Sequence, residues 1–216
     1  SEVEVLIFVA QKRDYISPVT AAILQDKMGL SKDCVAFDVP LGCSGYVYGL
    51  SVIQSFMAAS GLKKGLLLVG EATISDASYR DKTVYPIFGD AGSATAVELD
   101  KTAAPIHYNL QTDGSGYEAI IIPHGGKRHP ITKDSITYKK HGKGIIRRDD
   151  QAILDGMAIF KFAVNEVPAQ VKALAAKCDL TLEEVDYFVF HQANKIINET
   201  IRKILRVPPE KMPYSL

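Results

Sequence analysis

The sequence of 216 residues has few cysteines and no excess of charge. Its three cysteines, Cys34, Cys43 and Cys178, are odd in number and widely spaced, which fits neither a disulfide framework nor a Cys-x-x-Cys zinc site. Lys and Arg together number 25, and so do Asp and Glu. The chain has no net positive charge that would attract a polyanion, so the composition predicts no nucleic-acid partner. The cysteine pattern favours a reducing cytoplasm and predicts no metal site.

Long hydrophobic runs are also missing. The longest, at residues 5–10 and 65–70, are too short to span a bilayer, and the first residues lack the basic-then-apolar pattern of a signal peptide. The glycine-rich segments 89–94 and 113–116 have neither the Gly-Lys-Ser/Thr ending of a phosphate loop nor the spacing of a dinucleotide fingerprint. We therefore expect no membrane association and no nucleotide cofactor.

Short apolar stretches alternate with helical patterns in the first half of the chain. Continuous apolar residues predict buried strands, and apolar residues at three- and four-residue spacing predict helices. The predicted strands are 3–10, 34–39, 66–69, 94–99 and 119–122, and the predicted helices are 18–28 and 45–59. This alternation is typical of an α/β fold.

The second half continues with a predicted helix over 152–177, interrupted near Pro168, a strand over 187–190 and a helix over 194–205. Residues 2–8 resemble residues 184–190 position by position, and each segment precedes an amphipathic helix. The resemblance is either coincidence or the trace of two related α/β halves.

Cys43 lies in Pro-Leu-Gly-Cys-Ser-Gly-Tyr, after an apolar strand and at the start of a predicted helix. The positive end of the helix dipole and its unpaired N–H groups favour the thiolate, which would lower the pKa of the sulfur and prepare it to attack a carbonyl. Gly42 and Gly45 would let a substrate approach the backbone closely. The alternative is that Cys43 is a small buried apolar residue.

His191 stands in Phe-His-Gln-Ala-Asn, at the carboxyl end of the predicted strand. Ligand-binding residues occupy that end of the strands in α/β sheets, where an imidazole can move a proton or hydrogen-bond a thioester oxygen. A structural histidine satisfied by local partners is the alternative. Sequence spacing alone does not bring His191 to Cys43.

Residues 127–148 contain eight Lys and Arg residues and a single acid, Asp134. The excess could receive an acidic carrier protein or the phosphates of coenzyme A. A solvated insertion with no partner is the other interpretation.

Three separated motifs together resemble one family: residues 36–39 leading into 42–50, then 88–94, then 191–194. The family is 3-oxoacyl-(acyl-carrier-protein) synthase III, also called beta-ketoacyl-ACP synthase III, of the thiolase-like superfamily. The resemblance implies a thiolase-like five-layer αβαβα fold and a homodimer. It divides the chain into halves at 1–103 and 104–216, the first incomplete at its start and the second at its end.

The resemblance also implies an activity. Cys43 would take an acyl group from acyl-CoA, supported by backbone groups of Gly42 and Ser44, and the acyl-enzyme would condense with malonyl-acyl-carrier protein as carbon dioxide leaves. His191 would stabilise the enolate oxygen of the malonyl thioester. Coenzyme A and carrier-protein thioesters would be substrates in fatty acid synthesis, with no further cofactor.

Two departures from the family pattern leave alternatives open. The Asn-Thr-Ser segment whose asparagine works with the histidine does not occur before Leu216, and Lys195 and Ile196 stand where an arginine often helps to bind the carrier or coenzyme A. Lys161, Lys195 and Asn194 are the candidates for that contact. An acyl transferase of a specialised pathway that does not condense, or a non-catalytic thiolase-fold binding partner, would also fit.

Overall fold

The computed structural model describes residues 2–215 and divides them into two compact units. The first contains the chain up to Ala72 and the segment from Gly89 to Ile106. The second contains the segment from Thr73 to Phe88 and the chain from His107 onward. Each unit is built around its own apolar core.

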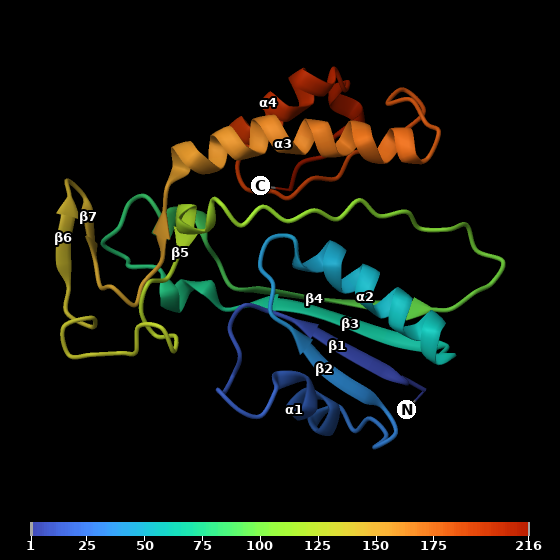
Figure 1. Cartoon of the computed structure of the whole chain (residues 1–216), viewed down its shortest axis with the longest axis horizontal. Coiled ribbons are helices and arrows are strands. Elements are labelled where there is room, and N and C mark those ends of the chain that lie inside the picture. The colour runs from blue at the N-terminus through green and yellow to red at the C-terminus, as the bar shows by residue number, and fades with distance from the viewer. Residues whose placement is uncertain (1, 216) are drawn as a thin grey trace. The chain divides into compact units, whose positions relative to one another are not determined.

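A four-stranded sheet with two helices forms the first unit (Figure 1). Its elements in chain order are β1 (Val5–Val9), α1 (Thr20–Lys27), β2 (Val35–Val39), α2 (Gly45–Ser60), β3 (Lys64–Glu71) and β4 (Ala91–Glu98). The strand order is β2-β1-β3-β4, with β1 parallel to both neighbours and β4 antiparallel to β3. The predicted α/β alternation is thus confirmed for this unit.

Strand β1 is apolar throughout because helices cover both faces of the sheet. Val5 and Ile7 pack with Ile53 of α2, whereas Leu6 packs with Ala21 of α1. Successive strand residues point to opposite faces, so the run of consecutive apolar residues serves two cores. Figure 1 shows α1 and α2 on opposite sides of the sheet.

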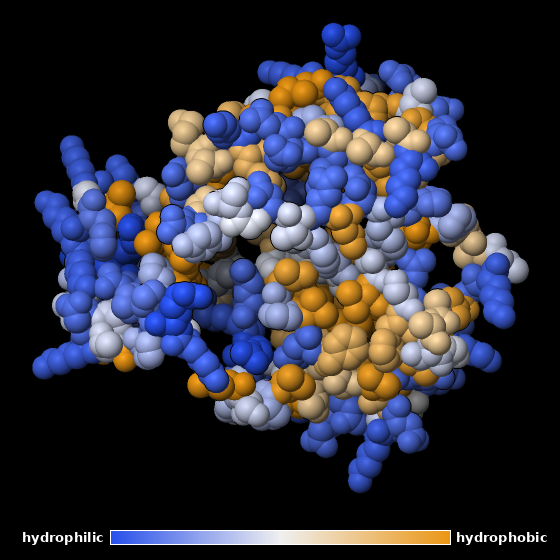
Figure 2. All heavy atoms as spheres, in the orientation of Figure 1, coloured by the Kyte–Doolittle hydropathy of each residue, from blue (hydrophilic) through white to orange (hydrophobic). Residues whose placement is uncertain are grey.

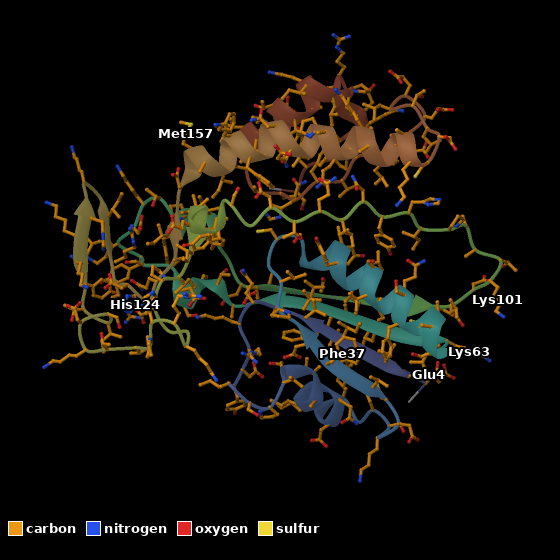
Figure 3. All side chains as sticks on the ribbon, in the orientation of Figure 1. Glu4, Phe37, Lys63, Lys101, His124 and Met157 are labelled. Carbon is orange, nitrogen blue, oxygen red and sulfur yellow. The ribbon has the colours of Figure 1, made fainter. Side chains whose placement is uncertain are left out.

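Polar contacts fix the edges of this sheet. The Glu4 carboxylate accepts the N–H groups of Lys63 and Lys64 at 2.5 and 2.9 Å, where β3 begins (Figure 3). At the start of α1, the Asp38 carboxylate accepts the N–H groups of Thr20 and Ala21 at 2.9 and 2.7 Å. The first N–H groups of a helix have no acceptor within the helix, so the Asp38 carboxylate supplies one for these two residues.

Two packed helices and short strand pairs form the second unit. Its elements are β5 (Ile120–Ile121), β6 (Lys139–Gly142), β7 (Ile145–Arg147), β8 (Ile153–Leu154), α3 (Gly156–Lys177) and α4 (Lys195–Leu205), together with 3-10 turns at Thr73–Asp76, Tyr85–Ile87, Tyr117–Ala119 and Pro209–Lys211. Strand β5 pairs with β8, and β6 pairs with β7, both antiparallel. Helices α3 and α4 lie side by side over a shared core (Figure 1).

The predicted break near Pro168 is wrong, because α3 continues through this residue. Pro168 removes one backbone donor, but Val167 and Val171 on either side pack against the α4 core and hold the helix together. The helix also begins later than predicted. Asp155 is its N-cap and accepts the N–H groups of Met157 and Ala158, both at 3.0 Å.

The strand predicted over 187–190 is also absent from the structure of residues 2–215. The segment is extended, with Phe188 buried and Phe190 half-buried in the α3–α4 core, while Tyr187 and Val189 are exposed. Phe188 donates its backbone N–H to the Lys211 carbonyl at 2.8 Å. The segment alternates between exposed and more buried residues as a strand can, but a strand also requires a ladder of hydrogen bonds, so the predicted strand is wrong.

Among the helices of residues 2–215, none combines the length and the apolar character needed to cross a membrane.

Candidate active site

Cys43 occupies the turn that joins β2 to α2. Gly45, the first residue of α2, donates its N–H to the Gly42 carbonyl at 2.7 Å and so closes the turn around the cysteine. Cys43 and Ser44 are exposed, and Ser44 is the N-cap without a side-chain capping bond. The first turn of α2 carries no acidic residue, so its own side chains add no negative charge to oppose the helix dipole near the sulfur.

Cys34 and Cys43 differ sharply in their surroundings. Cys34 is 8% exposed and packs with Leu6 and Ala21, and burial raises the pKa of its thiol. None of the cysteines forms a disulfide. The interpretation of a cysteine as a small buried apolar residue therefore applies to Cys34, whereas it is wrong for the exposed Cys43.

Close helix–sheet packing fixes the position of this turn. A β-carbon at Gly45 would lie 2.6 Å from Cγ1 of Val9, and one at Gly49 would lie 2.8 Å from Cδ1 of Leu67. The two glycines are four residues apart and share one helix face. They let α2 lie directly on β1 and β3, so the role of Gly45 is helix–sheet packing rather than the substrate approach that the sequence suggested.

Gln11 supports the turn from the other side, although no motif in the sequence marks this residue. A β-carbon at Gly42 would lie 2.7 Å from Cδ of Gln11, so the glutamine side chain rests against Gly42. The Glu71 carboxylate accepts the N–H groups of Gln11 and Lys12 at 2.6 and 3.2 Å. The loop after β1, the end of β3 and the cysteine turn are thereby joined.

His191 is exposed in the loop before α4. Its neighbour Gln192 donates to the Phe190 carbonyl at 2.9 Å and accepts the Ser215 N–H at 3.2 Å. One side chain thus ties the histidine loop both to the segment before it and to the tail of the described chain. Nothing in the sequence pattern distinguishes Gln192 as a bridging residue.

Asn194 is the N-cap of α4, because its side-chain oxygen accepts the Ile197 N–H at 2.9 Å. Lys195, the first residue of α4, and Lys161, on α3, are both exposed. The structure therefore brings His191, Asn194 and Lys195 together at the N-terminus of α4, in the same unit as Lys161.

Cys43 belongs to the first unit and His191 to the second. Within residues 2–215, no group of His, Cys, Asp and Glu side chains is arranged to hold a metal ion.

An α/β unit that presents a cysteine ahead of a helix, followed by a unit that presents a histidine ahead of another, places this protein in the thiolase-like class. Comparison with known proteins narrows the class. The family model for 3-oxoacyl-(acyl-carrier-protein) synthase III matches residues 37–114, and the family model for the C-terminal region of the same proteins matches residues 175–216. Together they cover more than half of the chain, which belongs to the 3-oxoacyl-(acyl-carrier-protein) synthase III family.

Curated relatives and solved structures agree with this assignment. The beta-ketoacyl-(acyl-carrier-protein) synthase III of Syntrophomonas wolfei is 32% identical over 216 residues, which is 100% of this chain and 62% of the relative. The protein of the same name from Chlamydia caviae is 31% identical, with 100% and 62% covered. The chain therefore spans about three fifths of the length of these relatives.

A crystal structure of 3-oxoacyl-(acyl-carrier-protein) synthase III matches with a TM-score of 0.90 and 33% identity, covering 98% of this chain and 64% of the other. The 3-oxoacyl-(acyl-carrier protein) synthase of Burkholderia xenovorans matches with a TM-score of 0.84 and 29% identity, covering 99% and 60%. The thiolase-like fold of the chain is thus the fold of its family.

Proposed function

We propose that the protein is a condensing acyltransferase that joins an acyl group held on Cys43 to a malonyl unit delivered by acyl-carrier protein. The observation that carries the proposal is the exposed Cys43 immediately ahead of α2, in a chain of this family. A nucleophilic thiolate needs an accessible sulfur and a locally positive environment, and this position offers both.

The first half-reaction loads the enzyme. The Cys43 thiolate attacks the carbonyl carbon of an acyl-CoA thioester, and backbone groups of Gly42 and Ser44 support the oxyanion. The bond from that carbon to the sulfur of coenzyme A breaks, and the coenzyme leaves as its thiol once protonated. The acyl group remains as a thioester on Cys43.

The second half-reaction forms the carbon–carbon bond. Malonyl-carrier protein loses carbon dioxide, and the electron pair of the broken bond becomes an enolate whose oxygen accepts a hydrogen bond from His191. The enolate carbon attacks the acyl carbonyl, and the Cys43 thiolate is released. Acyl-CoA and malonyl-carrier protein are thus the substrates, in fatty acid or related acyl-chain synthesis in the cytoplasm, without a further cofactor.

Lys161, Lys195 and Asn194 would contact the carrier or coenzyme A. The two lysines are exposed, as a contact with an anionic ligand requires. The oxygen of Asn194 already accepts the Ile197 N–H, so a ligand contact would use its amide nitrogen.

The whole protein would be a homodimer of chains with two related halves, divided near residue 103. Support for the dimer comes from β4, an eight-residue edge strand with small side chains from Ala91 to Ala96. Leu99, just after β4, donates its N–H to the Lys63 carbonyl, so the backbone N–H groups of odd-numbered residues in β4 point toward β3. The N–H groups of the even-numbered Ala94 and Ala96 therefore point to the open edge of the sheet. A two-fold axis can place the same edge of a second copy antiparallel beside it.

Mass spectrometry tests the loading step. The full-length protein is incubated with short acyl-CoAs, and we expect an acyl adduct on Cys43 that Cys43→Ser abolishes and Cys34→Ser, at the buried cysteine, leaves intact. An intact fold without an adduct would exclude both the condensing enzyme and a simple acyl transferase, and would favour a non-catalytic binding protein.

Adding malonyl-carrier protein tests the condensation. We expect a ketoacyl product, and we expect His191→Ala to slow its formation by about 100-fold or more while Cys43 acylation continues. Acylation without a ketoacyl product would leave only acyl transfer. Equal loss of both steps in His191→Ala would contradict the role given to the histidine.

A further inference from the structure

Residues 127–148, here called the basic lobe, are folded rather than loose. Strands β6 and β7 form a hairpin in which Lys139 pairs with Arg147. Ser135, 1% exposed, exchanges hydrogen bonds with Thr132, and the Ser135 carbonyl accepts the Asp149 N–H at 2.9 Å. His124, at the entry to the lobe, donates its N–H to the Asp149 carbonyl (Figure 3). The charges of the lobe are therefore held on a defined surface.

Three of the eight basic side chains form ion pairs with acidic residues of the same chain. Lys139 contacts Asp134 and Asp149 at 2.8 and 2.6 Å. Arg147 contacts Asp81, whose side chain is fully buried, at 3.1 Å. Arg148 forms a two-pronged pair with Asp150 through Nε and Nη2, at 2.8 and 3.0 Å. These pairs build the lobe and are not available to a partner.

The other five cations are exposed, and none forms an ion pair with another residue of the described chain, 2–215. They are Lys127, Arg128, Lys133, Lys140 and Lys143. Figure 2 shows hydrophilic side chains gathered over β6 and β7, at the left of the view. Because the whole chain holds equal numbers of acidic and basic residues, the rest of the chain has an acidic excess equal to the basic excess of the lobe. The zero net charge conceals one localised positive surface.

The chemistry of these cations selects the type of partner. Four of the five are lysines, which act as point charges, whereas the fork of arginine is better suited to phosphate. The two arginines with a fixed geometry, Arg147 and Arg148, already bind Asp81 and Asp150. Exposed lysines spread along the lobe suit a carboxylate-rich protein surface more than a phosphate ester, and the acidic remainder of the chain disfavours nucleic acid.

We propose that the basic lobe docks the acidic surface of the protein that carries the malonyl thioester. The inference rests on the proposed function and gives it a docking surface distinct from Lys161 and Lys195. Docking by rim charges accelerates encounter and depends on salt, because the Debye length is about 8 Å at physiological ionic strength. The lobe would therefore raise apparent affinity for the carrier without acting on the thioester itself.

Charge reversal in the full-length protein tests this inference. The variants are Lys140→Glu/Lys143→Glu in the hairpin and Lys127→Glu/Arg128→Glu in the preceding turn. Lys27→Glu/Lys32→Glu, at exposed lysines of the first unit, makes the same change in net charge away from the lobe and serves as the control. Substrates are malonyl-carrier protein and malonyl-pantetheine, which has the same reacting group but neither protein nor phosphate.

We expect each lobe variant to raise KM for malonyl-carrier protein on the order of tenfold at low salt, with kcat and the KM for malonyl-pantetheine unchanged. At about 1 M salt, where the Debye length is about 3 Å, the difference from the wild type should vanish. An unchanged KM for the carrier, or an equal rise in the control, would overturn the proposal. So would a rise confined to acyl-CoA, which would identify the phosphates of coenzyme A as the ligand.

Fluorescence anisotropy with a labelled carrier protein separates docking from catalysis, because it requires no turnover. Weaker carrier binding by the lobe variants would support docking even if the wild type makes no ketoacyl product, in which case only the proposed function fails. Equal carrier binding by the wild type and the lobe variants would overturn the docking surface. Tighter binding of a DNA duplex than of the carrier would also overturn it.

Discussion

Gly49 determines how closely α2 approaches the sheet. Its absent side chain leaves room for Leu67 and Val9, which are 0% and 1% exposed and would each lie 2.8 Å from an added β-carbon. Gly49→Val should overpack this contact and destabilise the protein by about 1–3 kcal/mol. Chemical denaturation monitored by circular dichroism measures this change in the free energy of unfolding.

Gly89→Val is the matched control, because no atom lies within 4 Å of a β-carbon at Gly89. Equal stability of the Gly49 and Gly89 variants would show that the helix is not held against the sheet as described.

Asn194 allows capping to be separated from ligand binding. Asn194→Ala removes the acceptor for the Ile197 N–H and should cost about 1 kcal/mol, whereas Asn194→Asp keeps an acceptor and should restore the stability. Thermal unfolding of both variants measures this difference. If Asn194→Asp is stable but has a raised KM for either thioester substrate, the amide also contacts the ligand; an unstable Asp variant would contradict the capping role.

Sequence patterns identify single residues only when their neighbours carry information. Cys43 and His191 stand in recognisable motifs, and the Asn before Lys-Ile-Ile is a recognisable helix cap. Gln11 has no such context, and Gln192 stands in the histidine motif without a bridging role that the motif predicts. Each acts through contacts with residues brought near by folding, Gly42 and Glu71 in one case and Ser215 in the other. Such roles depend on tertiary structure and have no local signature.

At the scale of elements, a network joins α4 to the tail that follows it. The Glu199 carboxylate accepts hydrogen bonds from Nη2 of Arg202 at 2.8 Å and from the Tyr214 hydroxyl at 2.5 Å. The hydrogen bond from Arg202, and then that from Tyr214, lowers the pKa of Glu199 from 4.5 to about 2. Because the pKa of Glu199 is lower in the folded protein than in the unfolded chain, the ionised carboxylate stabilises the fold. This contribution is complete above about pH 4.5 and is lost as the pH falls from about 4.5 to about 2.

Glu199→Gln should therefore unfold at lower denaturant concentration than the wild type at pH 6, and the two midpoints should converge as the pH approaches 2.5. Urea unfolding between pH 6 and pH 2.5 measures the midpoints. Glu166→Gln, at an exposed glutamate of α3, should follow the wild type at every pH. A constant difference between Glu199→Gln and the wild type would show that the carboxylate does not titrate within this network.

The elements themselves were predictable to different extents. Strand β1 and helix α2 follow from their own residues, because apolar runs and helical spacing are local properties. The antiparallel direction of β4 is not local, since it depends on the path of residues 73–88, which belong to the second unit. The unbroken α3 and the missing ladder at 187–190 likewise depend on packing partners that no short window of sequence contains.

At the scale of the whole molecule, the edge of β4 should control dimer formation. Ala94→Pro removes an N–H that points to the open edge and leaves the ladder to β3 in place, so sedimentation velocity should show a shift from dimer to monomer. Ala94→Ser keeps the N–H and should remain dimeric. A folded Ala94→Pro variant that is still a dimer would place the interface elsewhere.

The bracing of the cysteine turn between Gln11 and Val9 has a consequence for divergence and engineering. Substitutions at Gly42, Gly45 or Gln11 would displace the sulfur, so these positions should tolerate little change in any active descendant. Tyr46 and Val47, in the first turn of α2, are 44% and 49% exposed and can vary without moving that frame. A library intended to change the acyl preference should therefore randomise exposed neighbours of the turn and leave its braces untouched.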